Sequence, residues 1–193
     1  GKEIARAFAA NGATVCVCDI NAGTLETAAK DIPGLKTIVC DVSKRQDIEP
    51  MVASAVEALG GLEVLVNNAG IAGPTAPVED VDPDQWEAVM TVDVIGTFHV
   101  TRLSIPHLKK SAAGSIVVMS SVAAHRGTVG MAAYAAARAA VEAMVRCAAL
   151  ELAPRRVRVN AIAAGAFRSP MHDRVSGRMP EAARDAYAAA HPL

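Results

Sequence analysis

Hydrophobic positions along the chain fall into short apolar runs that alternate with longer amphipathic segments. The runs at 14–18, 36–40, 62–66, 114–119 and 157–162 are rich in β-branched residues, which predicts strands. The segments at 2–11, 22–30, 43–59, 82–110 and 131–152 have the apolar spacing of helices. This alternation predicts a doubly wound α/β fold, a parallel sheet with helices on both faces.

Local signals place the ends of several helices. Asn21 and Ser43 are predicted N-caps, because both side chains can accept a hydrogen bond from a first-turn amide. Gly12 and Gly60 follow predicted helix ends. Pro106 predicts a break or bend in the helix over 82–110, since proline removes a helix hydrogen bond.

Length and charge narrow the class of protein. The 193 residues predict one domain over 1–193, and the net charge of −1 comes without a basic stripe. Nucleic acid and anionic membrane are therefore poor candidate partners. The apolar stretch over 129–153 is interrupted by charged residues, which is typical of a buried or interface helix rather than a membrane span.

The four cysteines have the spacing of neither a zinc knuckle nor a redox motif. Cys16 and Cys18 form a C-x-C pair, but alternate strand positions often face one core, so no metal site is predicted. Buried free thiols in a reducing compartment are the interpretation, which favours a cytoplasmic location.

Polar residues follow the predicted strands at Asp19, at Asp41, at 67–68 and at 120–121. Ligands of parallel sheets bind beyond the carboxyl ends of the strands, so this pattern indicates a ligand site. Asp19 can accept hydrogen bonds from an adenosine ribose and would repel a 2′-phosphate, which favours NAD over NADP. Taken alone, Asp19 is more typical of a helix start or a turn.

Ser121 and Tyr134 offer an acid–base pair for a carbonyl oxygen. Ser121 ends a strand and Tyr134 lies early in a helix, so a serine hydroxyl could hold the oxygen while the tyrosine gives it a proton. Arg138 follows Tyr134 by one helical turn, and a cation there favours the phenolate form of a tyrosine. The alternative for an isolated pair is a buried tyrosine beside a surface arginine.

Taken together, these motifs resemble the short-chain dehydrogenase/reductase family of the non-extended type, over essentially the whole chain. The matching pieces, in family order and spacing, are Asp19, Asp41-Val42, Asn67-Asn68-Ala69-Gly70, the 114–117 run leading to Ser120-Ser121, Tyr134, and Asn160-Ala161-Ile162.

The resemblance implies a role for each candidate residue. Tyr134 would be the catalytic acid/base, Ser121 the hydroxyl that orients the carbonyl, and Arg138 and Asp93 would complete the catalytic site. The implied cofactor-binding residues are Gly1, Asp19, Ile20, Asp41, Val42, Asn68, Ala69, Gly70, Tyr134, Arg138, Gly165, Phe167 and Ser169.

Two departures from the family pattern concern the catalytic site. Arg138 stands where the family has lysine and cannot release a proton, so a lysine-based proton relay should be impaired. Asp93 stands where the family has asparagine. The two changes could be linked by an Asp93–Arg138 ion pair that draws the cation away from Tyr134, or they could be independent.

The remaining departures concern the chain ends and one loop. The family's opening strand, most of its glycine turn and its last strand and helix are absent, which predicts a fragment with a gap in the sheet and apolar edges on either side. Gly1 would be the last glycine of that turn. The family's Pro-Gly reads Ala164-Gly165, and Ser169 stands in place of threonine.

Two functions follow from these features. One is an oxidoreductase that passes a hydride between NAD(H) and a secondary alcohol or ketone, 3-oxoacyl carbonyls included, at a reduced rate. The other is an impaired NAD-binding homologue or assembly partner; a degraded reading frame is a further possibility. By resemblance, the helices over 83–109 and 131–152 would pair into a homodimer or homotetramer.

Overall fold

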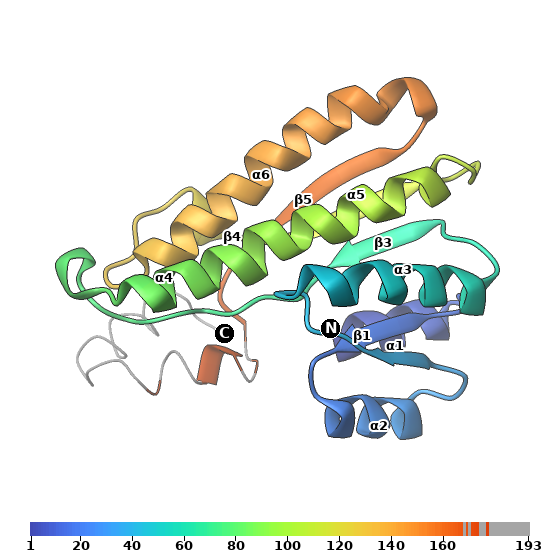
Figure 1. Ribbon diagram of the computed structural model, residues 1–193, viewed down its shortest axis with the longest axis horizontal. Helices are drawn as coiled ribbons and strands as arrows, with labels where there is room; N and C mark the ends of the chain where they lie inside the picture. Colours follow the sequence, from blue (N-terminus) through green and yellow to red (C-terminus); the bar gives the residue numbers. More distant parts are fainter. Residues whose placement is uncertain (168, 170, 174–176, 178–193) are drawn as a thin grey trace.

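The computed structural model describes residues 1–167, 169, 171–173 and 177. Within these residues, strands and helices alternate as the hydrophobic pattern predicts (Figure 1). The strands are β1 (Cys16–Asp19), β2 (Lys36–Val39), β3 (Val64–Asn67), β4 (Ser115–Ser121) and β5 (Arg158–Ala164). The main helices are α1 (Lys2–Ala10), α2 (Ala22–Asp31), α3 (Arg45–Leu59), α4 (Pro83–Val89), α5 (Thr97–Leu108) and α6 (Ala132–Leu152).

All strand pairs among the described residues are parallel, but they form two sheets rather than one. β1 pairs with β2, and β4 lies between β3 and β5. β1 and β3 are not hydrogen-bonded to each other, so each has one edge without a strand partner in the part of the chain that the structure describes. That a further strand belongs between them stays a prediction.

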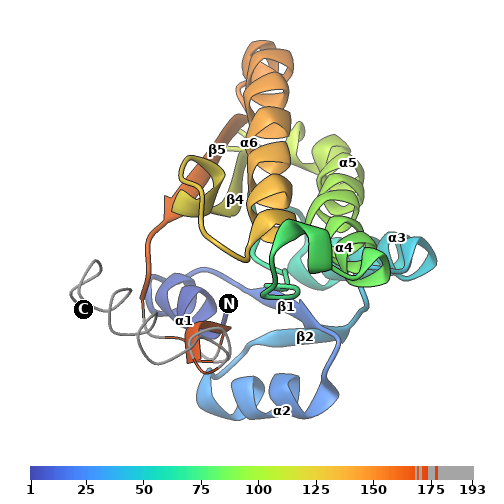
Figure 2. The same ribbon diagram turned by 90° about the vertical axis from the view of Figure 1, so that its left-hand side faces the viewer.

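The helices form layers on the two faces of the strands. α3, α5 and α6 lie on one face, while α1 and α2 lie on the other, beside the β1–β2 pair (Figures 1 and 2). Two apolar cores hold this arrangement. One packs α6 and Leu108 of α5 against β4 and β5, and the other packs α3 and Val100 of α5 against the β1–β2 pair. α5 contributes to both cores and so joins the two sheets.

The helix ends predicted at Asn21 and Gly60 are confirmed, and the cap predicted at Ser43 is wrong. The side chain of Asn21 accepts the amide hydrogen bond of Thr24, and Gly60 ends α3 with a φ of 75°. Ser43 does not cap α3. Its hydroxyl donates to Asp41 Oδ1 at 2.7 Å, and Lys44 takes the cap position without a side-chain hydrogen bond. α3 begins at Arg45, so the cap position falls one residue after Ser43.

The helix does not break at Pro106, and the alternative of a bend there stays a prediction. Pro106 lies near the end of α5, which continues to Leu108. The irregularity lies instead at 90–96, where a π-helical segment, η2 (Met90–Gly96), joins α4 to α5. π-helical turns are uncommon and often occur at functional sites. Asp93, a predicted site residue, lies in the middle of this one.

The continuous helix Pro83–Leu108 is long and apolar enough to cross a membrane by length and composition. Val89, Val100 and Leu108 of this helix are buried inside the protein, with exposures of 0–8%. Packing into the domain core therefore accounts for these apolar residues.

The burial of the cysteines differs in part from the expectation of buried thiols. All four cysteines are free, but only Cys40 is buried and Cys147 is exposed. Burial raises the pKa of the Cys18 thiol to about 11.

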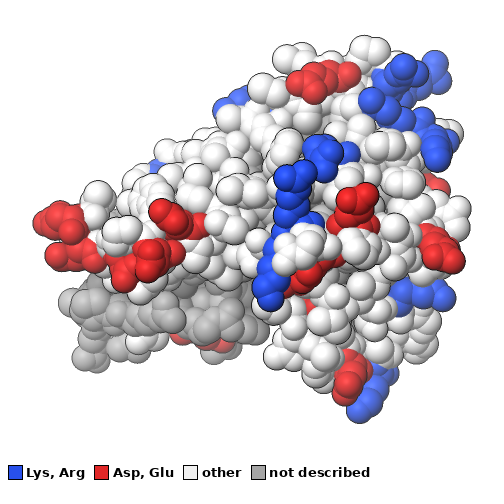
Figure 3. Space-filling model, viewed as in Figure 1, with Lys and Arg blue, Asp and Glu red and all other residues white. Residues whose placement is uncertain are grey.

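On the face shown in Figure 3, acidic side chains gather over the start of α4, and basic side chains lie over the middle and the opposite end.

Candidate active site

The carboxyl ends of β3 and β4 lie at the same edge of their sheet. Parallel pairing places Asn67 opposite Val118 and Ser121 opposite Ala164. The loop after β3 and the segment after β4 therefore leave the sheet at one edge. The first turns of α6 carry Tyr134 and Arg138, and Arg138 contacts this end of β4 through the carbonyl oxygen of Met119.

An ion pair between Asp93 and Arg138 forms the buried centre of the site. Arg138 Nη2 lies 2.7 Å from Asp93 Oδ2, and the two side chains are 6% and 0% exposed. The expected ion pair is present, but it does not draw the cation away from Tyr134, because the guanidinium carbon lies 4.8 Å from the centroid of that ring. That the two changes arose together stays a prediction. A buried pair of this kind costs desolvation of both ions, so its retention requires further hydrogen bonds.

Those hydrogen bonds come from the loop after β3 and from β4. Asp93 Oδ1 accepts the amide of Ile71 at 2.8 Å, and Arg138 Nη1 donates to the carbonyl oxygen of Met119 at 2.9 Å. The pair thus joins the loop, the π-helical segment, β4 and α6. Arg138 Nε is buried without a protein partner among the described residues.

Arg138 also lies over the ring of Tyr134. The guanidinium carbon is 4.8 Å from the ring centroid, within the range of a cation–π contact. The cation therefore stands beside the phenol while its Nη atoms are held by Asp93 and Met119.

Burial raises the pKa of Asp93 to about 6, while the charge of Arg138 and the amide of Ile71 act in the opposite direction. At neutral pH most of the Asp93 carboxylate is therefore ionised and the pair is formed. At lower pH the carboxyl takes up a proton and the pair is lost.

Gly70 provides the space that Arg138 occupies. A Cβ atom at Gly70 would lie 2.3 Å from Arg138 Nη2 and 3.1 Å from Asp93 Oδ1. Real Cβ atoms essentially never approach so closely, so any larger residue would displace the guanidinium or the loop. The family motif residue and the two departures from the family pattern thus depend on one another sterically.

The predicted adenosine side of the site is open and turn-rich. A Cβ at Gly1, the residue before α1, would lie 3.1 Å from the side-chain nitrogen Nδ2 of Asn68, so these residues are neighbours. Asp19 is exposed, and its Oδ1 accepts the amide of Asn21 at 2.9 Å. Ile20 is 67% exposed, and Asn68 and Ala69 are exposed as well.

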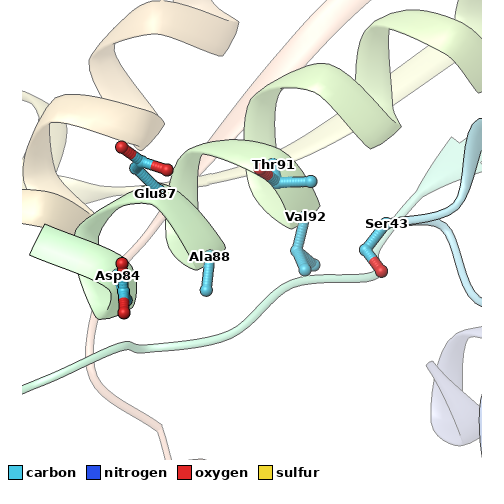
Figure 4. A pocket seen from close by; sticks show the side chains of 6 residues that line it. All are labelled: Ser43, Asp84, Glu87, Ala88, Thr91 and Val92. Atoms are coloured by element: carbon cyan, nitrogen blue, oxygen red, sulfur yellow. The ribbon is translucent and has the colours of Figure 1, made fainter.

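Asp41 and Val42 lie beside η2. A Cβ at Gly96 would come 2.7 Å from the carbonyl oxygen of Val42, so the two backbones are in close contact. Next to them is a hollow of about 400 Å³ between the loop before α3 and the helices α4 and η2 (Figure 4). It is lined by Ser43, Asp84, Glu87, Ala88, Thr91 and Val92. This hollow flanks the predicted adenine side rather than Tyr134.

The residues after β5 are only partly described. Gly165 and Phe167 are exposed, and the Ser169 hydroxyl accepts the amide of His172 at 3.1 Å. The described contacts do not join these residues to Tyr134 or Arg138. The rest of the predicted substrate-shaping tail, at 168, 170, 174–176 and 178–193, lies outside the described residues.

Comparisons with known proteins show the family of the chain. The family model for short chain dehydrogenase matches residues 1–189. The 3-oxoacyl-(acyl-carrier-protein) reductase FabG of Thermotoga maritima is 38% identical over 197 aligned residues, covering 100% of this chain and 78% of the relative. The chain belongs to the short-chain dehydrogenase family.

Solved structures of family members share the fold. NAD+-bound xylitol dehydrogenase superposes with a TM-score of 0.84 at 34% identity, covering 91% of this chain and 70% of that chain. Actinorhodin polyketide ketoreductase with NADPH superposes with a TM-score of 0.86 at 29% identity, covering 100% of this chain and 72% of that chain. Similar structures thus include both NAD+ and NADPH complexes. Membership supports an oxidoreductase acting on CH–OH or carbonyl groups with a nicotinamide cofactor.

Sequence reasoning missed one residue of this family member's site region. Glu142 of α6 is buried, accepts a 2.6 Å hydrogen bond from Ser120, and lies 2.9 Å from His125. The available signal was its spacing: Glu142 follows Tyr134 and Arg138 at intervals of one helical turn, on the same helix face.

Proposed function

We propose that this chain is the cofactor-binding and catalytic part of an oxidoreductase that exchanges a hydride between NAD(H) and a secondary alcohol or ketone. The observation that carries the proposal is the fixed cation of Arg138, 4.8 Å from the Tyr134 ring at the edge of the sheet where Ser121 ends β4. 3-Oxoacyl-type carbonyls are included, in view of the similarity to the Thermotoga reductase.

The described residues fit a nicotinamide dinucleotide. Gly1 and Asn68 are in close approach, as a phosphate-binding turn beside a ribose-lining loop requires, and Arg138 Nε is a buried donor without a protein partner. Asp19 ends β1 with an exposed carboxylate that could accept ribose hydroxyls and would repel a 2′-phosphate, which favours NAD over NADP. Ile20, Asp41, Val42, Ala69 and Gly70 would line the adenosine half, and Gly165, Phe167 and Ser169 the nicotinamide half.

When bound, the cofactor supplies or accepts the hydride. Tyr134 would give a proton to the carbonyl oxygen, or take it from the alcohol, and Ser121 would hold that oxygen by a hydrogen bond. Asp93 and Met119 would hold Arg138 beside the Tyr134 ring. Because arginine keeps its proton, Tyr134 must exchange its own proton with water by another route, and we expect a slow proton step.

The decisive experiment is NAD(H) turnover by the full-length protein with a panel of secondary alcohols and ketones. Tyr134→Phe and Ser121→Ala should each lower kcat by roughly 100- to 10,000-fold. Ser111→Ala is a matched control: like Ser121, Ser111 accepts the amide two residues later, but it lies in the loop before β4. Unchanged turnover in Tyr134→Phe would refute the catalytic assignment.

A second function, an NAD-binding or assembly homologue without turnover, has one observation in its favour. Both Nη atoms of Arg138 are engaged by Asp93 and Met119. If that engagement disables the site, the wild type should bind NAD without turnover, and the Asp93→Asn, Arg138→Lys double variant should gain activity. Silence in the double variant as well, with NAD binding intact, would leave the binding role.

Oligomerisation and location form the last part of the proposal. Ile95 and Phe98 are 48% and 45% exposed on the α4–α5 helix, which supports pairing of that surface in a homodimer or homotetramer. We propose a small-molecule substrate and a cytoplasmic location. Light scattering of Phe98→Glu against the wild type tests the pairing surface, and an unchanged mass would refute it.

A further inference from the structure

Glu142 is a buried carboxylate that the proposed chemistry does not use. It lies on α6 and is 7% exposed, and Tyr134 and Arg138 precede it on the same helix. Burying a carboxylate costs several kcal/mol unless its oxygens are hydrogen-bonded or paired. Both oxygens of Glu142 have such a partner, and the two partners come from one short segment.

The first partner is Ser120. Its hydroxyl donates to Glu142 Oε1 at 2.6 Å, and the carbonyl oxygen of Arg138 is a more distant acceptor at 3.4 Å. A hydroxyl has one proton, so the short bond to the carboxylate is the one that forms. Ser120 is 5% exposed, which shields this bond from water.

The second partner is His125. Its Nε2 lies 2.9 Å from Glu142 Oε2, while the His125 side chain is 60% exposed. His125 follows the short 3-10 helix η3 (Val122–Ala124). Glu142 therefore contacts the residue before Ser121 and the residue after η3.

Ser121 lies inside the segment that these two contacts hold. Its side chain accepts the amide of Ala123 at 3.2 Å, so Ser121 and η3 form one local turn. A carboxylate that ties both ends of this turn to α6 also sets its position relative to Tyr134, which α6 carries. We propose that Glu142 is a positioning residue that fixes the position of Ser121 relative to Tyr134. His125 is the solvent-exposed one of its two contacts. The catalytic part of this proposal rests on the proposed function of Ser121 and Tyr134.

Three variants separate positioning from general stability. Glu142→Leu removes both contacts, whereas Glu142→Gln keeps an acceptor for Ser120 and an N–H donor for a neutral imidazole. Glu151→Gln is the matched control, because Glu151 is an exposed carboxylate near the end of α6. Each full-length variant is assayed for kcat, KM and NAD affinity, and amide hydrogen exchange is measured over residues 120–128.

Glu142→Leu should lower kcat by roughly 10- to 100-fold, because a displacement of about 1 Å at a reacting group has effects of that size. NAD affinity should stay within about twofold, since the dinucleotide contacts lie elsewhere, and exchange over 120–128 should accelerate. Glu142→Gln should recover most of kcat, and Glu151→Gln should match the wild type.

Wild-type kcat and unchanged exchange in Glu142→Leu would overturn the proposal. So would equal losses of kcat and NAD affinity in Glu142→Leu and Glu142→Gln, which indicate a structural role alone. Hydrogen exchange needs no turnover. A wild type without activity would therefore refute the proposed function, while exchange in Glu142→Leu would still decide whether Glu142 holds the segment.

Discussion

Replacing Arg138 with methionine should move the titration of Asp93 across neutral pH. The substitution keeps an apolar stem in the space of the arginine and removes the charge 2.7 Å from the carboxylate. In the native pair, burial raises the pKa of Asp93 to about 6, and Arg138 is the main influence that lowers it. Without the cation, the pKa of Asp93 should rise further.

The size of the change follows from the geometry. Two unit charges about 4 Å apart interact by about 4 kcal/mol at an effective dielectric constant of about 20. One pKa unit corresponds to about 1.4 kcal/mol, so this interaction is equivalent to a rise of about 3 pKa units. The folded Arg138→Met variant should therefore hold a largely protonated Asp93 at pH 7.

The effect on stability has a definite sign. A carboxyl whose folded pKa lies above its unfolded value binds more protons in the folded state, so stability falls as pH rises through that interval. For the wild type the interval ends near pH 6, the pKa of Asp93 in the folded protein. For Arg138→Met it should extend above pH 7, with a slope of about 1.4 kcal/mol per pH unit.

Urea unfolding between pH 6 and 8.5 measures this slope. The double variant Asp93→Asn, Arg138→Met is the control, because it has no carboxyl to titrate at that site. The free energy of unfolding of Arg138→Met should fall with pH relative to the double variant. A pH-independent difference between these two variants would show that Arg138 does not hold the charge of Asp93.

Three further outcomes follow from the described contacts. Gly70→Ala should lower NAD affinity and kcat by at least about tenfold, because its Cβ would lie 2.3 Å from Arg138 Nη2; Gly127→Ala, with nothing within 4 Å of its Cβ, is the control, and equal enzyme kinetics in both would contradict the steric argument. Asp19→Ala should shift the ratio of NADP to NAD affinity towards NADP by about tenfold or more, measured by fluorescence titration, since a carboxylate repels a 2′-phosphate; an unchanged ratio would remove Asp19 from the ribose site. Asn21→Ala should lower the free energy of unfolding by about 1 kcal/mol through loss of the cap on Thr24, and a change near zero in urea unfolding would show that the cap contributes nothing.

The parts of the fold that depend on local patterns could be predicted from the sequence. Apolar runs gave the strands to within two residues at most ends, and Asn21 and Gly60 marked helix ends through backbone chemistry that involves only neighbouring residues. Ser43 and Pro106 were misinterpreted because the exact helix ends are not fixed by these residues alone. α3 begins one residue later than a cap at Ser43 requires, and only two residues of α5 follow Pro106.

Site residues could be predicted where a family motif specifies the residue type and its position in the chain. They were harder to predict where a side chain pairs with residues distant in the sequence. The Asp93–Arg138 pair could be inferred because two family positions changed together, each acquiring charge of opposite sign. Glu142 had no such guide. Its partners, Ser120 and His125, lie 22 and 17 positions away along the chain, and only the packing of η3 and β4 on α6 brings them to it.

Asp93 and Glu142 each hold a different part of the candidate site through α6. The buried arginine that stands in place of lysine needs a counter-charge, and Asp93 supplies it. Arg138 Nη2 contacts Asp93, and Arg138 Nη1 donates to the carbonyl oxygen of Met119. The cation then has little freedom to follow the reaction. The described contacts of Glu142 are instead with Ser120 and His125, on either side of Ser121. Changes at Asp93 should therefore alter the proton step and the pH profile, whereas changes at Glu142 should lower kcat without moving the profile. A common effect of both substitutions on the pH profile would show that the two carboxylates form one coupled network.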